Sequence, residues 1–328
     1  MERNDAWKGG AQRVNGFRRC GKVRHSAPAG YAAALTSILI WGTTFIVSKV
    51  ILEDFRPVEV ILIRMVLGLV ALFLASPRLP RVRTVPEELS YAVAGFCGIV
   101  LYFLLENTAL THGLASNVGV IISAAPFFTA ILNRLFYRSD RLQVRFFVGF
   151  ALAMTGIGLI SFNGVRMQIS PLGDLLALGA AASWGLYSVL VRRAGGFGLS
   201  TLQATQRIFL YGVLFLAILS PFLGLRPNLA HLVQPKFFLP FLYLGLGASA
   251  LCFFAWNFAV EALGPVRTSV SAYLIPVVAV TAGALALGEP VTPLSLLGTV
   301  LILGGLAVSE WRAGRGSDGG ERATKRRQ

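Results

Sequence analysis

The fold class follows from a run of mostly apolar residues, PVEVILIRMVLGLVALFLAS, at positions 57–76. A helix needs about 20 apolar residues, at about 1.5 Å each, to cross about 30 Å of hydrocarbon, and this run has that length. Further runs of the same kind occur on both sides of it. The predicted spans are residues 31–51, 57–76, 89–110, 114–135, 143–162, 173–191, 201–222, 238–259, 266–287 and 293–311. We therefore expect an all-α membrane protein with ten transmembrane helices.

The composition excludes the main alternatives to a membrane protein. Hydrophobic residues make up 55% of the chain and charged residues only 14%, whereas soluble domains carry about 25% charged residues. The mean hydropathy is +0.67. The spans must be helices, because lipid offers backbone groups no hydrogen-bond partner. The runs are also unbroken, unlike the alternating strands of a membrane barrel.

The basic residues are distributed unevenly between the two sides of the predicted spans. With ten spans both termini share one side, and 23 of the 30 Lys and Arg residues fall there. The opposite side has Arg56, Arg166, Arg226 and Lys236. Cytoplasmic loops carry the excess of basic residues, so both termini are expected in the cytoplasm, with the chain integral to the cell (inner) membrane. The net charge of +15 thus needs no nucleic-acid partner.

The two halves of the chain resemble each other. Matching residues lie 143 positions apart in the first spans and 149 or 150 apart later. The matched pairs are Trp41 with Trp184, Arg64 with Arg207, Asn107 with Asn257, Pro126 with Pro276, Gly149 with Gly298, and Gly156 with Gly305. Because five spans is an odd number, a second copy enters the membrane from the other face. We expect two inverted five-helix repeats, residues 30–162 and 163–311, between a basic arm (1–29) and a basic tail (312–328).

Inverted repeats are typical of secondary transporters, whose two halves rock around a site near the midplane. A duplication is also an economical way to build a helical bundle with no transport role.

Several motifs resemble the EamA family of the drug/metabolite transporter superfamily. They are Trp41-Gly42-Thr43-Thr44-Phe45-Ile46, Gly173-Asp174-Leu175-Leu176-Ala177-Leu178, Ala182-Ser183-Trp184 and Gly288-Glu289-Pro290-Val291. Where the family usually has Gly-Glu after the fourth helix, this chain has Arg138-Ser139-Asp140. The resemblance implies a ten-helix inner-membrane transporter, commonly an exporter of amino acids, metabolites or drug-like compounds.

Polar and aromatic side chains within the spans are candidates for a substrate cavity. Ser37, Trp41 and Thr44 fall on one helical face, the two repeated Trp residues can stack on a ligand, and a mid-span proline kinks its helix. The alternative is that hydroxyls bond to helices and that the rings fill the core. The candidates are Ser37, Trp41, Thr44, Tyr102, Asn107, Ser123, Pro126, Trp184, Tyr187, Trp256, Asn257, Ser269, Tyr273 and Pro276.

Among the charged residues of the spans, the candidates for gating or charge pairing are Lys49, Arg64, Glu106 and Arg207. A charge at mid-bilayer costs at least about 2.5–3.5 kcal/mol. One interpretation is a gate, with an arginine that binds an anionic group and a carboxylate that takes a proton or an amine. The other is a set of structural ion pairs or side chains that reach the interface.

The sequence has none of the motifs that we looked for as signs of an enzyme or an ATP-driven protein. The chain has no Walker loop and no nucleophile-base motif. Cys20, Cys97 and Cys252 lie far apart in the sequence and the three His residues are scattered. We expect no enzyme, metal or cofactor, and name a small-molecule substrate and the lipid bilayer as partners. An intramembrane enzyme acting on lipid and a non-saturable channel are the alternatives. The glycine faces of spans five and ten suit either scaffold helices or a homodimer contact.

Overall fold

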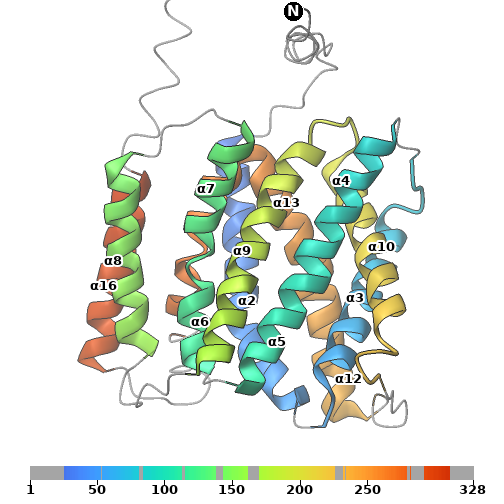
Figure 1. Cartoon of the computed structure of the whole chain (residues 1–328), viewed down its shortest axis with the longest axis horizontal. Coiled ribbons are helices and arrows are strands. Elements are labelled where there is room, and N and C mark those ends of the chain that lie inside the picture. Colours follow the sequence, from blue (N-terminus) through green and yellow to red (C-terminus); the bar gives the residue numbers. More distant parts are fainter. Residues whose placement is uncertain are drawn as a thin grey trace, which may run out of the picture.

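The computed structural model describes residues 26–52, 54–80, 84–112, 115–137, 143–161, 170–225, 232, 234–278, 281 and 292–310. In this part of the chain the regular elements are helices that run side by side in one bundle (Figure 1). The first half contains α2 (Ala27–Leu52), α3 (Pro57–Ala75), α4 (Val85–Gly95), η2 (Phe96–Leu101), α5 (Tyr102–His112), α6 (Ala115–Ile122), α7 (Ala125–Tyr137) and α8 (Val144–Ser161). The second half contains α9 (Pro171–Ala194), α10 (Thr201–Leu219), α12 (Pro235–Leu242), η3 (Tyr243–Leu251), α13 (Cys252–Leu263), α14 (Pro265–Ser271) and α16 (Pro293–Glu310).

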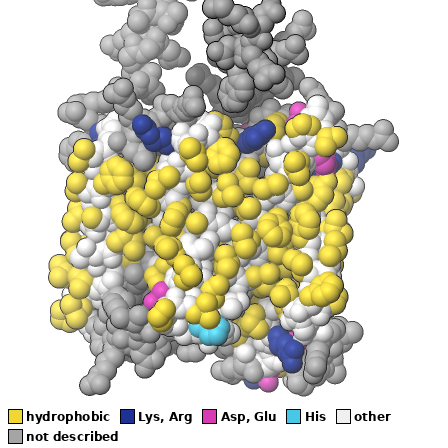
Figure 2. All heavy atoms as spheres, in the orientation of Figure 1, with side chains coloured by type: hydrophobic (Ala, Val, Ile, Leu, Met, Phe, Trp, Pro, Cys, Tyr) yellow, Lys and Arg dark blue, Asp and Glu magenta, His cyan; other side chains and the backbone are white. Residues whose placement is uncertain are grey.

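The helices have the length and surface of membrane spans. Among the described residues, five helices are long and apolar enough to cross a bilayer, namely Pro57–Ala75, Val85–Ala109, Pro171–Ala194, Thr201–Leu219 and Pro235–Leu263. Figure 2 shows hydrophobic side chains over the middle of the visible face, with most of the charged side chains in view near its two ends. The protein is therefore an integral membrane protein. The motifs at 138–140 and 288–291 lie outside the described residues.

Helix starts follow local chemistry. Proline suits the first helical turn because its missing N–H would have no helical acceptor there, and it opens several helices here. α10 begins instead with a capping box, in which the Ser200 side chain accepts from the Gln203 backbone N–H (3.3 Å) and Gln203 accepts from the Ser200 N–H (3.2 Å). The helices that open on proline are α3, α9, α12, α14 and α16.

Two long helices contain a segment of wide π-helical turns. The segment η2 separates α4 from α5, and η3 separates α12 from α13. They end at Leu101 and Leu251, which are 150 positions apart, the offset that relates Asn107 to Asn257. Such turns are rare in proteins and are frequent at functional sites.

Two other helices are interrupted just before a proline. The break between α6 and α7 lies at Ser123 and Ala124, and the turn after α14 lies at Ala272 and Tyr273. Pro126 and the equivalent Pro276 follow these breaks, and proline cannot donate the backbone hydrogen bond of a continuing helix.

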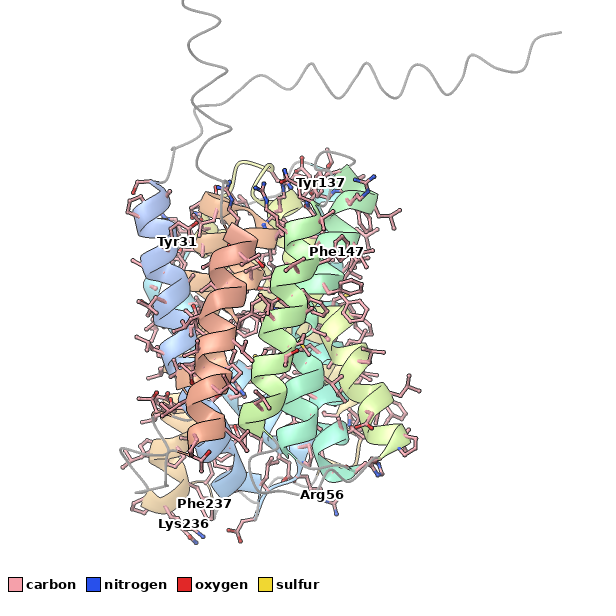
Figure 3. All side chains as sticks on the ribbon, turned by 90° about the vertical axis from the view of Figure 1, so that its left-hand side faces the viewer. Tyr31, Arg56, Tyr137, Phe147, Lys236 and Phe237 are labelled. Carbon is pink, nitrogen blue, oxygen red and sulfur yellow. The ribbon has the colours of Figure 1, made fainter. Side chains whose placement is uncertain are left out.

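Glycines set the contact between α8 and α16, which lie next to each other along one flank of the bundle (Figures 1 and 3). A methyl group on Gly305 would lie 2.5 Å from the Gly149 carbonyl oxygen, and one on Gly149 would lie 2.6 Å from the Gly305 carbonyl oxygen. Gly156 faces the Gly298 backbone in the same way. The contact is thus reciprocal, and the two backbones touch without side chains between them.

A second pair of glycines permits close helix crossings. A methyl group on Gly42 of α2 would overlap the Val278 side chain, and one on Gly185 of α9 would lie 2.9 Å from the Thr129 backbone nitrogen. Gly42 and Gly185 are 143 positions apart. Each half therefore brings its interrupted helix against the first helix of the other half.

The ends of the bundle carry short polar contacts. Arg56 donates to the Gly224 carbonyl (2.8 Å), and Lys236 lies 3.4 Å from the Asp54 carboxylate. Figure 3 shows Arg56 and Lys236 at the end of the bundle opposite Tyr137.

Candidate functional site

Five aromatic side chains meet in the middle of the bundle. The central aromatic cluster consists of Trp41 (α2), Tyr102 (α5), Trp184 (α9), Phe253 and Trp256 (α13). Ring centroids lie 5.4 Å apart for Trp41 and Trp184, 5.2 Å for Trp41 and Trp256, and 4.9 Å for Tyr102 and Trp184. Phe253 lies 5.7 Å from Trp184. In this conformation the rings pack against each other, and both sequence halves contribute to them.

The polar edges of these rings differ in their bonding. The Trp41 indole N–H donates to the Ala248 carbonyl of η3 at 2.9 Å, so it joins α2 to a π-helical segment of the other half. The Trp256 side chain is fully buried, and its indole N–H has no hydrogen-bond partner among the described residues. An unpaired buried donor costs about 1–3 kcal/mol, so Trp256 is held there by its ring contacts.

A buried hydrogen-bond chain leads away from the cluster on one side. The Tyr187 ring lies 5.1 Å from that of Trp184, and its hydroxyl donates to Asn257 Oδ1 at 2.6 Å. Asn257 Nδ2 donates in turn to Thr205 Oγ1 at 2.9 Å. These contacts join α9, α13 and α10.

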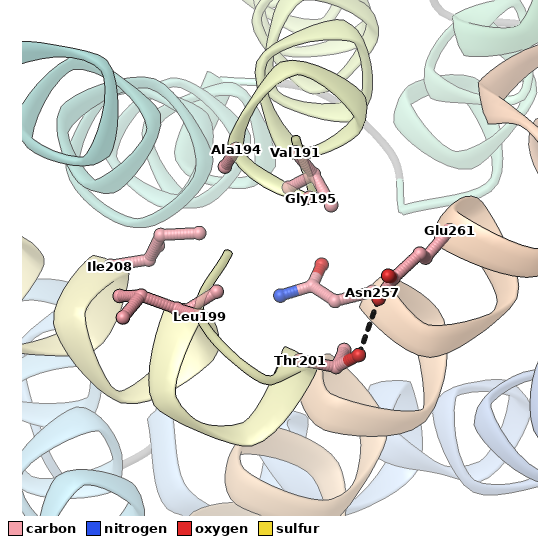
Figure 4. Close-up of a pocket in the computed structure, with 9 residues that line it drawn as sticks. Val191, Ala194, Gly195, Leu199, Thr201, Ile208, Asn257 and Glu261 are labelled. Atoms are coloured by element: carbon pink, nitrogen blue, oxygen red, sulfur yellow. Dashed lines mark hydrogen bonds between the residues drawn. The ribbon is translucent and has the colours of Figure 1, made fainter. Parts of the chain in front are cut away.

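The hydrogen bonds of Tyr187, Asn257 and Thr205 lead to a small pocket, here called the Glu261 pocket. Asn257 and Glu261 of α13, Thr201 of α10 and the end of α9 at Ala194 line it (Figure 4). Thr201 Oγ1 donates to the Glu261 carboxylate at 2.5 Å. The pocket has room for about one water molecule.

A pair of opposite charges lies on the other side of the cluster. Arg64 is 7% exposed and Glu106 is 9% exposed, and the two interact electrostatically. Arg64 Nε donates to Ser249 Oγ at 3.0 Å, and its guanidinium lies 4.7 Å from the centre of the Phe103 ring. Glu106 also interacts with the Tyr102 hydroxyl. Because Tyr102 belongs to the central aromatic cluster, this pair adjoins the cluster directly.

Arg207, the sequence counterpart of Arg64, has different partners. Its guanidinium pairs with Glu88 of α4 and donates to the Pro80 carbonyl. The Tyr211 hydroxyl donates to the same carboxylate, and the Arg207 guanidinium lies 6.0 Å from the Tyr91 ring. The sequence left open whether Arg207 is a gate or a structural ion pair, and these contacts favour the structural interpretation.

Several predicted cavity residues bond to backbone. The acceptor carbonyls are those of Cys252 for Ser37 (3.0 Å), Trp41 for Thr44 (2.7 Å), Phe103 for Asn107 (2.8 Å) and Gly119 for Ser123 (2.7 Å). Ser37 thus ties α2 to α13. Thr44 and Asn107 bond within their own helices, and Ser123, in the break after α6, bonds back to α6.

The remaining candidates lie away from the cluster. Ser269 of α14 donates to Thr129 of α7 at 3.1 Å. Tyr273 packs in a separate apolar cluster with Phe146, and its buried hydroxyl has no partner among the described residues. The Lys49 side chain lies outside the described residues.

Sequence reasoning missed five polar residues of these sites. Glu261 and Thr201 form the pocket, Thr205 extends the chain, Ser249 holds Arg64, and Glu88 holds Arg207. A signal was present for Glu261, which follows Asn257 by four positions and so shares its helical face. Thr201 and Thr205 of α10 have the same spacing. Ser249 and Glu88 give no such signal, because they lie 185 and 119 positions from Arg64 and Arg207.

Curated proteins of similar sequence are named as transporters. A protein of Bacillus subtilis (strain 168), the "Uncharacterized transporter YdfC", is 28% identical over 275 residues, which cover 81% of this chain and 86% of that protein. A "Probable amino-acid metabolite efflux pump" of Salmonella typhimurium is 28% identical over 84% of this chain and 93% of that protein. A "Probable terminal-alkyne amino-acid exporter" of Streptantibioticus cattleyicolor is 28% identical over 84% of this chain and 91% of that protein.

The chain shares its fold with a solved structure and matches the model of a transporter family. The solved structure superposes with a TM-score of 0.72 at 19% identity, covers 87% of this chain and 99% of its own, and shows a shared fold. The model of the EamA-like transporter family matches residues 28–162 and 171–310. The family and the relatives' names are those of transporters rather than enzymes. This chain belongs to the EamA-like transporter family.

Proposed function

We propose that this protein is a secondary transporter that exports small organic molecules by alternating access. The observation that carries the proposal is the central aromatic cluster, because Trp41 and Tyr102 come from one half of the chain and Trp184 and Trp256 from the other. Rocking of the two halves would separate the rings and open a space between them.

Ten spans in two inverted repeats are part of this proposal. The π-helical segments, the breaks before Pro126 and Pro276 and the close approaches of Gly42 and Gly185 each recur at the sequence offset. The contact of Gly149 with Gly305 is matched by that of Gly156 with Gly298. Because Gly149 corresponds to Gly298 and Gly156 to Gly305, a two-fold relation between the halves would turn one contact into the other. The excess of Lys and Arg on one side supports cytoplasmic termini.

Amino acids and related metabolites are the substrates that we propose to test first. Two relatives are named for the export of amino acids or their metabolites. The site chemistry supports the extension of that class to this chain, since aromatic rings contact apolar and cationic groups. Arg64 and Glu106 add one charge of each sign next to the rings, and a zwitterion carries both charges.

Counterflow in proteoliposomes tests the proposal. Proteoliposomes that contain the purified protein are preloaded with an unlabelled amino-acid mixture. They are expected to accumulate external labelled amino acid transiently, and the initial uptake rate is expected to saturate with the external concentration of that amino acid. The assay is run with and without a pH gradient. Flux that never saturates would instead indicate a channel, and turnover of lipid without flux would indicate an intramembrane enzyme.

Trp184 offers a test of the cluster itself. Trp184→Leu keeps an apolar side chain but removes the aromatic face, so we expect counterflow to fall at least tenfold. Trp184→Phe, the matched control, is expected to keep most activity. Both variants are first compared for monodispersity and thermal unfolding, because a loss of folded protein in Trp184→Leu would mean that the ring serves core packing. Equal transport by both folded variants would contradict a role in binding.

A further inference from the structure

We propose that the Glu261 pocket is the entrance site at which the protein binds the ammonium group of an exported molecule, with Glu261 as the counter-ion. The inference rests on the proposed transport function and adds to it a site and a chemical class, the primary amines. The pocket lies at the end of the bundle that the Lys and Arg distribution assigns to the cytoplasm, where an exported molecule must enter.

The electrostatics of the pocket favour a cation. Among the described residues that line it, Glu261 alone carries a formal charge. Glu261 lies in the last turn of α13, which ends at Leu263, and α9 ends at Ala194 beside the same pocket. The carboxyl end of a helix carries a partial negative charge that stabilises cations. The Glu261 carboxylate and the partial charges of the two helix ends therefore all attract a bound ammonium group.

The acceptors of the pocket match the donors of an ammonium group. An ammonium group has three N–H donors and no acceptor. Glu261 offers carboxylate oxygens and Thr201 a hydroxyl oxygen, which already contact each other (Figure 4). Asn257 Oδ1 accepts from Tyr187 and retains a second lone pair. A ligand would add to, or exchange with, the interactions that Glu261 already makes.

The size of the pocket sets how a ligand would sit. Room for about one water molecule is also room for an ammonium group, but not for a whole amino acid. The walls beside the polar groups are apolar, with Val191 and Ala204 among them, and suit a short aliphatic stem. The ammonium group of the ligand would therefore enter the pocket first, and its aliphatic stem would follow as the pocket widens.

The pocket is linked to the central aromatic cluster by a hydrogen bond and a ring contact. Asn257 lines the pocket and bonds to Tyr187, whose ring lies 5.1 Å from Trp184. An amine that leaves Glu261 would thus meet first an amide and a hydroxyl and then the faces of the indole rings, which attract cations.

The test measures ligand-induced thermal stabilisation of the detergent-purified full chain. Isobutylamine is the probe, and isobutanol is its uncharged analogue of the same shape. The amine is expected to raise the unfolding temperature in a saturable way, and the alcohol is not. Glu261→Gln is expected to weaken amine binding at least tenfold. Asp54→Asn, which removes an exposed carboxylate at the opposite end, is expected to bind as the wild type does.

The outcomes separate this site from the transport proposal. Equal stabilisation of wild type and Glu261→Gln, or none of the wild type, would overturn the site even if counterflow occurs. Binding that depends on Glu261 without any counterflow would uphold the site and reject transport. If Glu261→Gln does not fold, Glu261→Asp and Thr201→Val replace it. Weaker amine binding in both would support the site, and unchanged binding in both would overturn it.

Discussion

Replacement of Arg64 with methionine is expected to lower the free energy of unfolding by about 3–5 kcal/mol, because it leaves the Glu106 carboxylate buried without its cation. The substitution also removes the bond to Ser249 and the contact with the Phe103 ring. Thermal unfolding of the purified variant in detergent, followed by intrinsic Trp fluorescence, measures the loss.

The double variant Arg64→Met/Glu106→Gln is the control for this prediction. It removes both charges together, and buried pairs replaced by neutral groups of similar volume often keep their stability. We expect it to recover most of the stability, while counterflow stays impaired because neither charge is left to contact a substrate. A single variant as stable as the double one would contradict the coupling of Arg64 and Glu106. Full counterflow by the double variant would assign the pair to structure alone.

A single methyl group at Gly305 is expected to destabilise the contact of α8 with α16. In Gly305→Ala the new Cβ would meet the Gly149 carbonyl oxygen at 2.5 Å, so the backbones must separate. Overpacking of this kind costs about 1–3 kcal/mol. We expect a lower unfolding temperature and a broadened size-exclusion profile.

Gly304 provides a matched control one residue away. A Cβ at this position meets nothing within 4 Å, and alanine is a better helix former than glycine by up to about 1 kcal/mol. Gly304→Ala is therefore expected to be neutral or slightly stabilising. If the two variants unfolded at the same temperature, the glycine contact would not hold the helices together.

The sequence predicted the parts of the structure that depend on local pattern. Apolar length alone placed five spans that the structure describes as membrane-length helices, and the family resemblance agrees with the matched family model. The breaks before Pro126 and Pro276 also follow from a local cause, since proline lacks the N–H that a helix needs.

The contacts between helices could not be predicted in this way. Asn107 and Asn257 match at the sequence offset of 150, yet Asn107 bonds to its own helix and Asn257 joins Tyr187 to Thr205. The reason is that their neighbours differ, because Thr44 and Leu62 stand at the positions that correspond to Tyr187 and Thr205. Equivalence in sequence preserves the backbone framework, whereas each hydrogen bond needs both partners.

The segments η2 and η3 have a practical consequence for any scan of these helices. Each wide turn holds more residues than the 3.6 of an α-helix, and one additional residue rotates everything after it by about 100°. A labelling series planned on a helical wheel that starts at Val85 or Pro235 loses phase within these segments. The wheel must be restarted after Leu101 and Leu251, or lipid-facing and inward-facing sites in α5 and α13 will be interchanged.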